Sequence, residues 1–298
     1  MAEQTSMTSS PPARSFDWKN LAFRAASAVV LIPAVLAAIW YGGGPFLLMV
    51  AIAIGLMSIE WGKMSAPEAP AEVAVAISVA ALAAVFAAYT GWYRSAWGLM
   101  IGGAFIAAAA SRGRAERAMD AAYGVIYIAP ACIALVWMRD VAHQLYEWRT
   151  DGGVNWTPGE GASWTVVTVA VTWAADIGAY AAGNVFKGPK LWPRISPNKT
   201  WSGFVGGLIL ASLAAVGVNS LVSTGLSSGA AAVVGVVGGL ATMAGDLWES
   251  ILKRRFGVKD SGDLIPGHGG LLDRVDGLMF ALIVVGLARL AHIHGWFV

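Results

Sequence analysis

The sequence predicts an all-α polytopic integral membrane protein with about nine transmembrane helices and a cytoplasmic N-terminus. The prediction depends on the composition and on a series of long apolar segments. Of the 298 residues, 57% are hydrophobic and 13% are charged, whereas soluble proteins average roughly 45–50% and about 25%. The composition therefore excludes an ordinary soluble globule, and the net charge of +2 gives no support to a nucleic-acid binder.

Two ranges divide the chain. Residues 1–20 are polar and contain Pro11 and Pro12, which predicts a disordered cytoplasmic tail. Residues 21–298 are predicted to form a single transmembrane helical domain. The only cysteine, Cys132, lies in an apolar run, which excludes an internal disulfide and a Cys-based zinc cluster.

Nine segments have the length and apolarity of a membrane-spanning helix. A helix needs about 17–25 apolar residues to cross a hydrocarbon core of roughly 30 Å. Because backbone groups in lipid must form their hydrogen bonds within the segment, we expect helices and no strands. Glycines four residues apart, at 235 and 239, predict close helix packing. The nine segments are 21–41, 46–62, 72–92, 95–111, 120–138, 164–185, 203–222, 228–248 and 277–297.

The basic residues predict the orientation, because Lys and Arg in short loops are retained in the cytoplasm. With nine spans and a cytoplasmic N-terminus, 16 of the 20 basic residues fall on the cytoplasmic side. One helix more or fewer would invert every later loop and abolish this asymmetry. The C-terminus is therefore predicted to face outward.

Charged residues gather in one predicted cytoplasmic hairpin. Eleven of the 38 charged residues lie between positions 246 and 276. Asp246, Glu249 and Lys253 are spaced i, i+3 and i+7, so they share one helical face. Asp273 and Asp276 are spaced i, i+3 at the start of the last helix, where the helix dipole favours negative charge. The two acidic faces are thus expected to converge on one cation.

The residue types around this hairpin predict a phosphate and Mg²⁺ site. Carboxylates without a neighbouring Cys or His ligand suit Mg²⁺, which takes one or two carboxylates and leaves positions for substrate phosphates. Glycines and cations between positions 253 and 270 provide amides and charge for a polyphosphate. A second basic stretch, residues 187–200, contains Ser196, Lys199 and Thr200 just before a predicted helix, and Asp176 lies upstream.

The polar residues between 250 and 276 resemble the signature of the phosphatidate cytidylyltransferases, also called CDP-diacylglycerol synthases. The matching residues are Ser250, Lys253, Arg254, Lys259, Asp260, Gly262, Ile265, Pro266, His268, Gly269, Gly270, Leu271, Asp273, Arg274, Val275 and Asp276. The similarity extends upstream through residues 176–183 and 195–203. Roughly the last 120 residues carry it, whereas the first 160 resemble the family only as hydrophobic helices.

The resemblance implies transfer of a cytidylyl group from CTP to phosphatidate, giving CDP-diacylglycerol and pyrophosphate with Mg²⁺. It also implies a bacterial inner membrane, a cytoplasmic active site, contact with membrane lipids and no nucleic acid; a homodimer is left open. Asp246 and Asp273 are the expected metal ligands. The expected catalytic residues are Asp246, Asp273, Lys253, Lys259 and Asp276. The expected substrate-binding residues are Ser196, Lys199, Thr200, Arg254, Asp260, His268, Arg274 and Asp176.

Structural interpretations of the same residues stand beside these roles. Asp246 and Asp273 could form salt bridges with Lys253 and Arg274, and Ser196 to Thr200 could be an ordinary helix N-terminus. Asp176 could make a structural hydrogen bond, Asp260 and Asp276 could be solvated, and His268 could brace the loop. The basic loop could serve topology and anionic-lipid attraction alone. Glu60, beside the cytoplasmic end of the second span, is assigned a structural role.

The alternative function is a polytopic membrane transporter with an ion site at the cytoplasmic edge. Polar groups inside a helix bundle often mark a permeation path. The acidic residues of this chain, however, gather at one membrane edge rather than at the midplane. A transporter should show flux in sealed vesicles and no nucleotide turnover.

Overall fold

The computed structural model describes residues 18–112, 115–139, 159–222, 224–264 and 269–296. Most of the predicted N-terminal tail lies outside these residues, and the first helix begins at Trp18. His268, expected to bind substrate, also lies outside the described residues.

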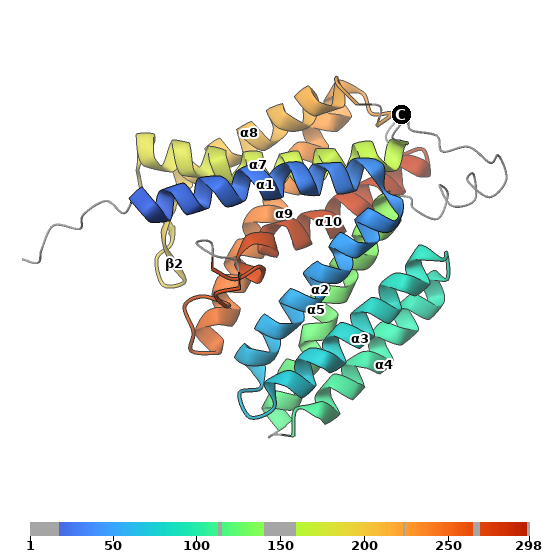
Figure 1. Cartoon of the computed structure of the whole chain (residues 1–298). Coiled ribbons are helices and arrows are strands. Elements are labelled where there is room, and N and C mark those ends of the chain that lie inside the picture. The colour runs from blue at the N-terminus through green and yellow to red at the C-terminus, as the bar shows by residue number, and fades with distance from the viewer. Residues whose placement is uncertain (1–17, 113–114, 140–158, 223, 265–268, 297–298) are drawn as a thin grey trace, which may run out of the picture.

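The described residues form nine helices and one antiparallel pair of short strands (Figure 1). The fold is thus all-α in class, as predicted. The helices of the first half are α1 (Trp18–Tyr41), α2 (Gly43–Ser65), α3 (Pro70–Tyr89), α4 (Tyr93–Ala110) and α5 (Ala115–Arg139). Those of the second half are α7 (Glu160–Phe186), α8 (Trp201–Asn219), α9 (Ser228–Arg255) and α10 (Leu272–Ile293), with the strands β1 (Lys190–Trp192) and β2 (Ser196–Thr200) between α7 and α8.

Each of the nine predicted segments coincides with one of these helices, although the bounds differ. The largest differences concern the charged hairpin, since α9 continues to Arg255 and α10 already begins at Leu272. Local chemistry explains several helix starts. Pro70 is the first residue of α3, where its missing backbone N–H costs no hydrogen bond within the helix. The hydroxyls of Thr200 and Ser227 accept hydrogen bonds from amides in the first turns of α8 and α9.

Seven helices in the described part of the chain are long and apolar enough to cross a membrane, namely α2, α3, α5, α7, α8, α9 and α10. Large apolar side chains such as Val75, Phe86 and Phe105 are 61%, 64% and 74% exposed. Outward apolar surface on long helices is what lipid contact requires. The length and apolar surface of these helices therefore indicate an integral membrane protein.

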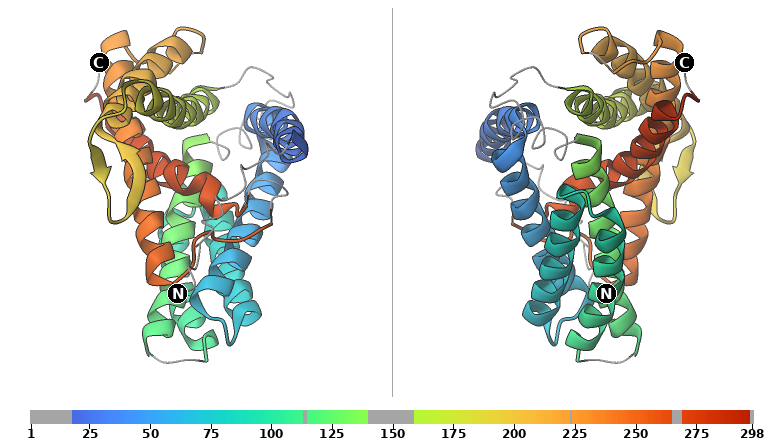
Figure 2. Two further views of the ribbon diagram at one scale, coloured as in Figure 1. Left: turned by 90° about the vertical axis from the view of Figure 1, so that its left-hand side faces the viewer. Right: turned by 90° about the vertical axis from the view of Figure 1, so that its right-hand side faces the viewer.

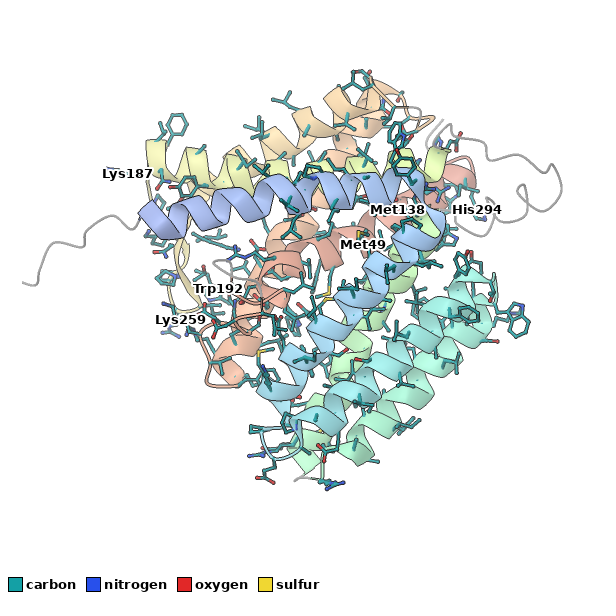
Figure 3. The ribbon with its side chains drawn as sticks, in the orientation of Figure 1. Met49, Met138, Lys187, Trp192, Lys259 and His294 are labelled. Carbon is teal, nitrogen blue, oxygen red and sulfur yellow. The ribbon has the colours of Figure 1, made fainter. Side chains whose placement is uncertain are left out.

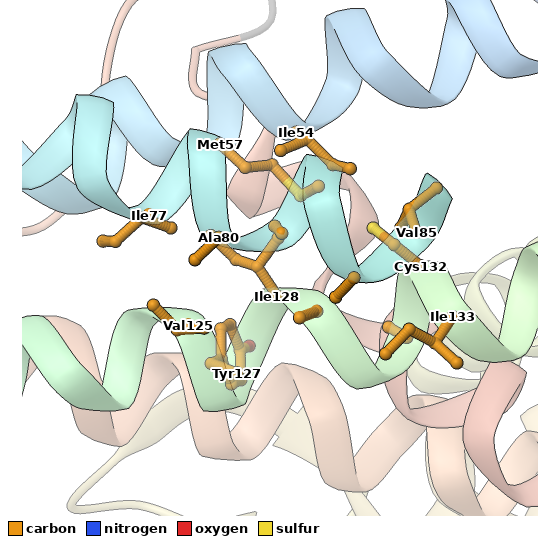
Figure 4. Packing of buried hydrophobic residues seen from close by; sticks show 14 of the residues in the cluster. Ile54, Met57, Ile77, Ala80, Val85, Val125, Tyr127, Ile128, Cys132 and Ile133 are labelled. Carbon is orange, nitrogen blue, oxygen red and sulfur yellow. The ribbon is translucent and has the colours of Figure 1, made fainter. Parts of the chain in front are cut away.

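The largest hydrophobic core joins α2, α3 and α5. Ile54, Ile77 and Ile128, one from each helix, are fully buried, and Figure 4 shows them packed between the ribbons. Close packing of branched side chains gives this half of the bundle a rigid interior. The same core includes Leu252 and Leu272, so it also packs against both helices of the charged hairpin.

The second half of the bundle is packed through small residues. A Cβ atom added at Gly178 of α7 would lie 2.7 Å from the carbonyl oxygen of Gly206 in α8. A Cβ added at Gly235 of α9 would lie 2.6 Å from Cα of Ser212, and one at Gly239 would lie 3.0 Å from Cβ of Ala211. The prediction that Gly235 and Gly239 serve helix packing is confirmed.

A β-hairpin connects α7 to α8, outside the nine segments for which helices were expected. Lys190 pairs with Thr200 and Trp192 with Ser196. The hairpin lies beside the charged end of α9 (Figures 1 and 2). Figure 3 places Lys187, Trp192 and Lys259 at this end of the molecule, whereas Met138 and His294 lie at the other. The hairpin therefore lies at the charge cluster that the sequence predicts.

Candidate active site

The centre of the site is an ion-paired triad between the last two helices. Lys253 Nζ of α9 lies 2.7 Å from Glu249 Oε2 and 2.6 Å from Asp273 Oδ1 of α10. The three side chains are only 16%, 5% and 11% exposed. The i, i+4 spacing places Glu249 and Lys253 on one helical face, as the sequence predicted. Within the structure, the cation on which the two acidic faces converge is the Lys253 ammonium.

Asp273 is also tied to the loop that precedes α10. Its Oδ2 accepts a hydrogen bond of 2.9 Å from the Ser261 amide. Asp273 stands in the first turn of α10, where unpaired helix amides favour negative charge. The carboxylate is thus held by an ammonium on one oxygen and by a backbone amide on the other.

The hairpin contributes a second ion pair. Lys199 Nζ of β2 lies 2.8 Å from Asp246 Oδ2 of α9. Thr200, the next residue, caps α8 through a 3.1 Å hydrogen bond from the Gly203 amide, and the Ser202 hydroxyl donates to the Lys187 carbonyl. These bonds anchor both ends of the hairpin, so Lys199 reaches the acidic cluster from a defined backbone position.

A fourth acidic residue, Asp276, lies close to Asp246 and Glu249. It is 9% exposed, and its Oδ1 accepts a hydrogen bond of 2.8 Å from the Gly277 amide. Its charge interacts with those of Asp246 and Glu249. Glu249 Oε1 is buried, and the side chain of Glu249 interacts with that of Asp276. The cluster therefore gathers four carboxylates and two lysines.

The close crossing of α9 and α10 requires glycine. A Cβ added at Gly245 would lie 2.5 Å from the Asp276 carbonyl oxygen, and one at Gly277 would lie 3.0 Å from Asp246 Oδ1. Larger residues would separate the two helices. The glycines thus allow the carboxylates of α9 and α10 to share one site.

The structure brings together several of the other predicted residues and leaves some apart. Asp176 of α7 is exposed, and its charge interacts with those of Asp246, Lys199 and Arg274. Arg254, Lys259 and Asp260 are exposed, and within the described residues they form no ion pair with the cluster. These three are available to a soluble substrate rather than fixed in the site.

Two structural interpretations offered from the sequence are confirmed. Asp273 does form a salt bridge with Lys253, and Thr200 does cap a helix. Neither excludes a catalytic role, because an ion pair can exchange its partner when a substrate arrives. For Asp246 the partner is Lys199, which sequence reasoning did not predict.

Sequence reasoning also underrated Glu60 of α2. This residue is fully buried, and its carboxylate accepts hydrogen bonds from the amides of Leu271 and Leu272 at the start of α10. Its assignment as structural fits these contacts, but its connection to the site was missed. The available signal was a carboxylate within an otherwise apolar helix, which is costly without dedicated partners.

The arrangement defines a class of protein before any comparison is made. A helical membrane protein that gathers buried carboxylates, lysines and exposed arginines at one end of its bundle is suited to phosphate chemistry beside lipid. Comparison with known sequences makes this specific. The cytidylyltransferase family matches residues 22–291, and the chain belongs to this family. The match reaches well into the first half, where the sequence by itself showed only hydrophobic helices.

Curated relatives agree with this assignment. A phosphatidate cytidylyltransferase of Brucella suis is 35% identical over 286 residues, covering 90% of this chain and 93% of the relative. The enzyme of the same name from Brucella melitensis has the same identity and coverage. That of Staphylococcus saprophyticus is 38% identical over 169 residues, which cover 57% of this chain and 59% of the relative.

Proposed function

We propose that this protein transfers the cytidylyl group of CTP to phosphatidate, giving CDP-diacylglycerol and pyrophosphate. The observation that carries the proposal is the similarity to phosphatidate cytidylyltransferases over nine-tenths of both chains. The acidic and basic cluster between α9, α10 and the hairpin supports it. In this reaction a phosphate oxygen of phosphatidate attacks the α-phosphorus of CTP, and the bond to the β-phosphate breaks as pyrophosphate leaves.

The main task of the residues is to bring two anions together. We propose that Lys199, Lys253 and Arg274 face the phosphates, and that exposed Arg254 and Lys259 guide CTP to the cluster. Fixed cations stabilise charge that develops on the leaving group, and positioning supplies much of the acceleration. The phosphatidate phosphate is already largely ionised near neutral pH, so no residue need act as a general base.

Of the remaining predicted residues, we propose that Ser196, Thr200, Asp260 and His268 contribute polar contacts to the substrates. Asp176 and Asp276 would orient the lysines through their charges. These roles extend the predictions from the sequence, and individual substitutions test them by the change in KM for CTP or phosphatidate.

We further propose that Asp246 and Asp273 hold Mg²⁺ when the substrates are bound. Mg²⁺ accepts one or two carboxylates and completes its shell with water and phosphate oxygens. The donors fit, since Asp246 and Asp273 offer the carboxylate oxygens that Mg²⁺ prefers. In the described ranges no group of three or more His, Cys, Asp and Glu is arranged to hold a metal. Bound there, Mg²⁺ would neutralise charge on the phosphates.

The lysines that now bind these aspartates would then be released toward the substrates. Lys199 is paired with Asp246 and Lys253 with Asp273. Each ammonium that leaves a carboxylate becomes free to bind a phosphate oxygen. We propose that this exchange couples arrival of the substrates to assembly of the site.

For the membrane topology, we propose nine crossings, with α1 and α4 added to the seven candidates. The N-terminus and the active site would then face the cytoplasm of a bacterium, across its inner membrane. CTP would come from the cytosol while the acyl chains of phosphatidate remain in lipid. A single domain formed by residues 21–298, contact with lipids and assembly as a homodimer remain predictions.

The decisive experiment measures incorporation of labelled CTP into phosphatidate by the purified protein in detergent, with and without Mg²⁺. We expect activity with Mg²⁺ that falls at least about 100-fold in Asp246→Asn and Asp273→Asn. Asp263→Asn is a matched control, because Asp263 is an exposed carboxylate in the loop between α9 and α10. Wild-type turnover in both aspartate variants would refute the metal assignment. Flux in sealed vesicles without nucleotide turnover would instead support a transporter.

A further inference from the structure

Glu60 places a buried carboxylate against the loop that leads into the site. It is 0% exposed, and it lies in α2, far in sequence from the acidic residues of the site. Its Oε1 accepts a hydrogen bond of 2.7 Å from the Leu271 amide, and its Oε2 accepts one of 2.8 Å from the Leu272 amide. The Ser261 hydroxyl lies 3.3 Å from Oε2. Figure 2 shows the segment before α10 extending to α2.

These contacts replace the missing cap of α10. The first amides of a helix have no carbonyl partner within the helix, and Leu271 has no side chain that could accept from them. Glu60 supplies both the acceptor oxygens and a negative charge at the positive end of the helix dipole. In the part of the chain that the structure describes, Glu60 has no ion-pair partner, so these hydrogen bonds are what compensates its buried charge.

The same contacts connect Glu60 to Asp273. Ser261 donates its hydroxyl to Glu60 and its amide to Asp273 Oδ2. Leu272, held by Glu60, immediately precedes Asp273. One residue therefore restrains Asp273 through two routes, along the helix start and across the loop.

The loop is shaped to allow this approach. A Cβ added at Gly262 would lie 3.0 Å from Cγ of Glu60. A Cβ added at Gly270 would lie 3.0 Å from Oε2 of Glu60 and would collide with the Ser261 hydroxyl. Side chains at either position would push the loop away from the carboxylate.

We infer that Glu60 is a positioning residue for the cytidylyl-transfer site: it fixes the start of α10 and the Ser261 loop so that Asp273 stays opposite α9. The inference rests on the proposed function. It assigns Glu60 no contact with the substrates. Its effect on the reaction passes through the position of Asp273.

The test compares Glu60→Gln with Glu60→Asp. Glutamine keeps the size but presents an NH₂ donor where one carboxylate oxygen now accepts. Aspartate keeps the charge but is shorter by one methylene. A displacement of about 1 Å can cost about 100-fold in rate, so we expect kcat/KM for CTP to fall about 10- to 100-fold in Glu60→Gln per folded molecule, with a smaller loss in Glu60→Asp. Glu72→Gln is the matched control, because Glu72 only forms an exposed ion pair with Arg112.

A second readout does not depend on activity. Hydrogen–deuterium exchange of a peptide covering residues 269–275 reports the two amides that donate to Glu60. We expect exchange there to accelerate in Glu60→Gln, while exchange in α3 stays as in the wild type. Glu72→Gln should leave both unchanged.

The outcomes separate this inference from the proposed function. A Glu60→Gln protein with a lower melting temperature but wild-type kcat/KM per folded molecule would show a purely structural role and overturn the inference. Unchanged exchange at 269–275 would overturn it as well. If the wild type itself transfers no cytidylyl group, the proposed function fails, and the exchange measurement still decides whether Glu60 holds α10. If Glu60→Gln does not fold, Ser261→Ala should give a smaller loss of kcat/KM and faster exchange, and wild-type values would count against the inference.

Discussion

Substitution of Lys253 tests whether ion pairing stabilises the site, because its ammonium compensates two buried carboxylates at once. In Lys253→Met an apolar chain of similar length replaces the lysine. Glu249 Oε2 and Asp273 Oδ1, now 2.7 Å and 2.6 Å from the ammonium, lose their cation. The two carboxylates then repel each other in a site that water barely reaches.

The structure indicates the size of the effect. Removing one partner of a buried ion pair costs about 3–5 kcal/mol, and that range applies here because the three side chains are 5–16% exposed. Proteins are stable by only about 5–15 kcal/mol. Lys253→Met should therefore remain folded at low temperature but lose a large part of its free energy of unfolding.

Unfolding in mixed micelles of increasing denaturing detergent, followed by tryptophan fluorescence, measures this loss. The informative comparison adds Glu249→Gln. In the wild-type background Glu249→Gln removes an ion pair and should destabilise, whereas in Lys253→Met it removes an uncompensated charge and should stabilise. A double-mutant cycle isolates this coupling. If the two substitutions prove additive, the carboxylates do not depend on Lys253 and the reasoning is wrong.

Two further predictions follow from neighbouring contacts. Lys199→Met removes the ammonium that lies 2.8 Å from Asp246 Oδ2. Because a charge-assisted hydrogen bond contributes about 1.5–3 kcal/mol before exposure weakens it, Mg²⁺ without nucleotide should raise the melting temperature of this variant at a concentration roughly 5- to 10-fold lower than in the wild type. An unchanged or higher Mg²⁺ concentration would contradict competition between the ammonium and the metal. Gly245→Ala places a Cβ about 2.5 Å from the Asp276 carbonyl oxygen. Because overpacking forces the helices apart, this substitution should lower the free energy of unfolding by about 1–3 kcal/mol and should also lower turnover. Gly229→Ala in the same helix, which meets nothing within 4 Å, should do neither, and equal effects of the two in a thermal melt would refute the crossing argument.

The helices were predictable because apolar segments of membrane length carry their own signal. All nine predicted segments are helical, and the shared face of Glu249 and Lys253 followed from spacing alone. The hairpin was not predictable in the same way. Residues 190–200 contain Pro193 and Pro197 and lack the alternation of polar and apolar residues by which strands are recognised. As a consequence, the pairing of Lys199 with Asp246 was missed.

The part of the site that depends on long-range contacts also escaped prediction. Spacing placed Asp273 at a helix start, but nothing in the local sequence indicates that the cap of this helix comes from Glu60, 212 positions before Leu272. A carboxylate in an apolar helix signals that a partner exists without saying which. Such contacts are fixed by how the helices pack, which only the three-dimensional structure shows.

The length of α9 has a consequence for where the reaction can occur. Its 28 residues correspond to about 42 Å at 1.5 Å per residue, whereas the hydrocarbon layer is only about 30 Å thick. If such a helix begins at one boundary of the hydrocarbon core, it extends roughly two turns beyond the opposite boundary. Those turns carry Glu249 and Lys253. In the proposed topology the charged groups would therefore lie at the depth of the lipid headgroups, and the lipid would not have to leave its leaflet to meet a water-soluble nucleotide.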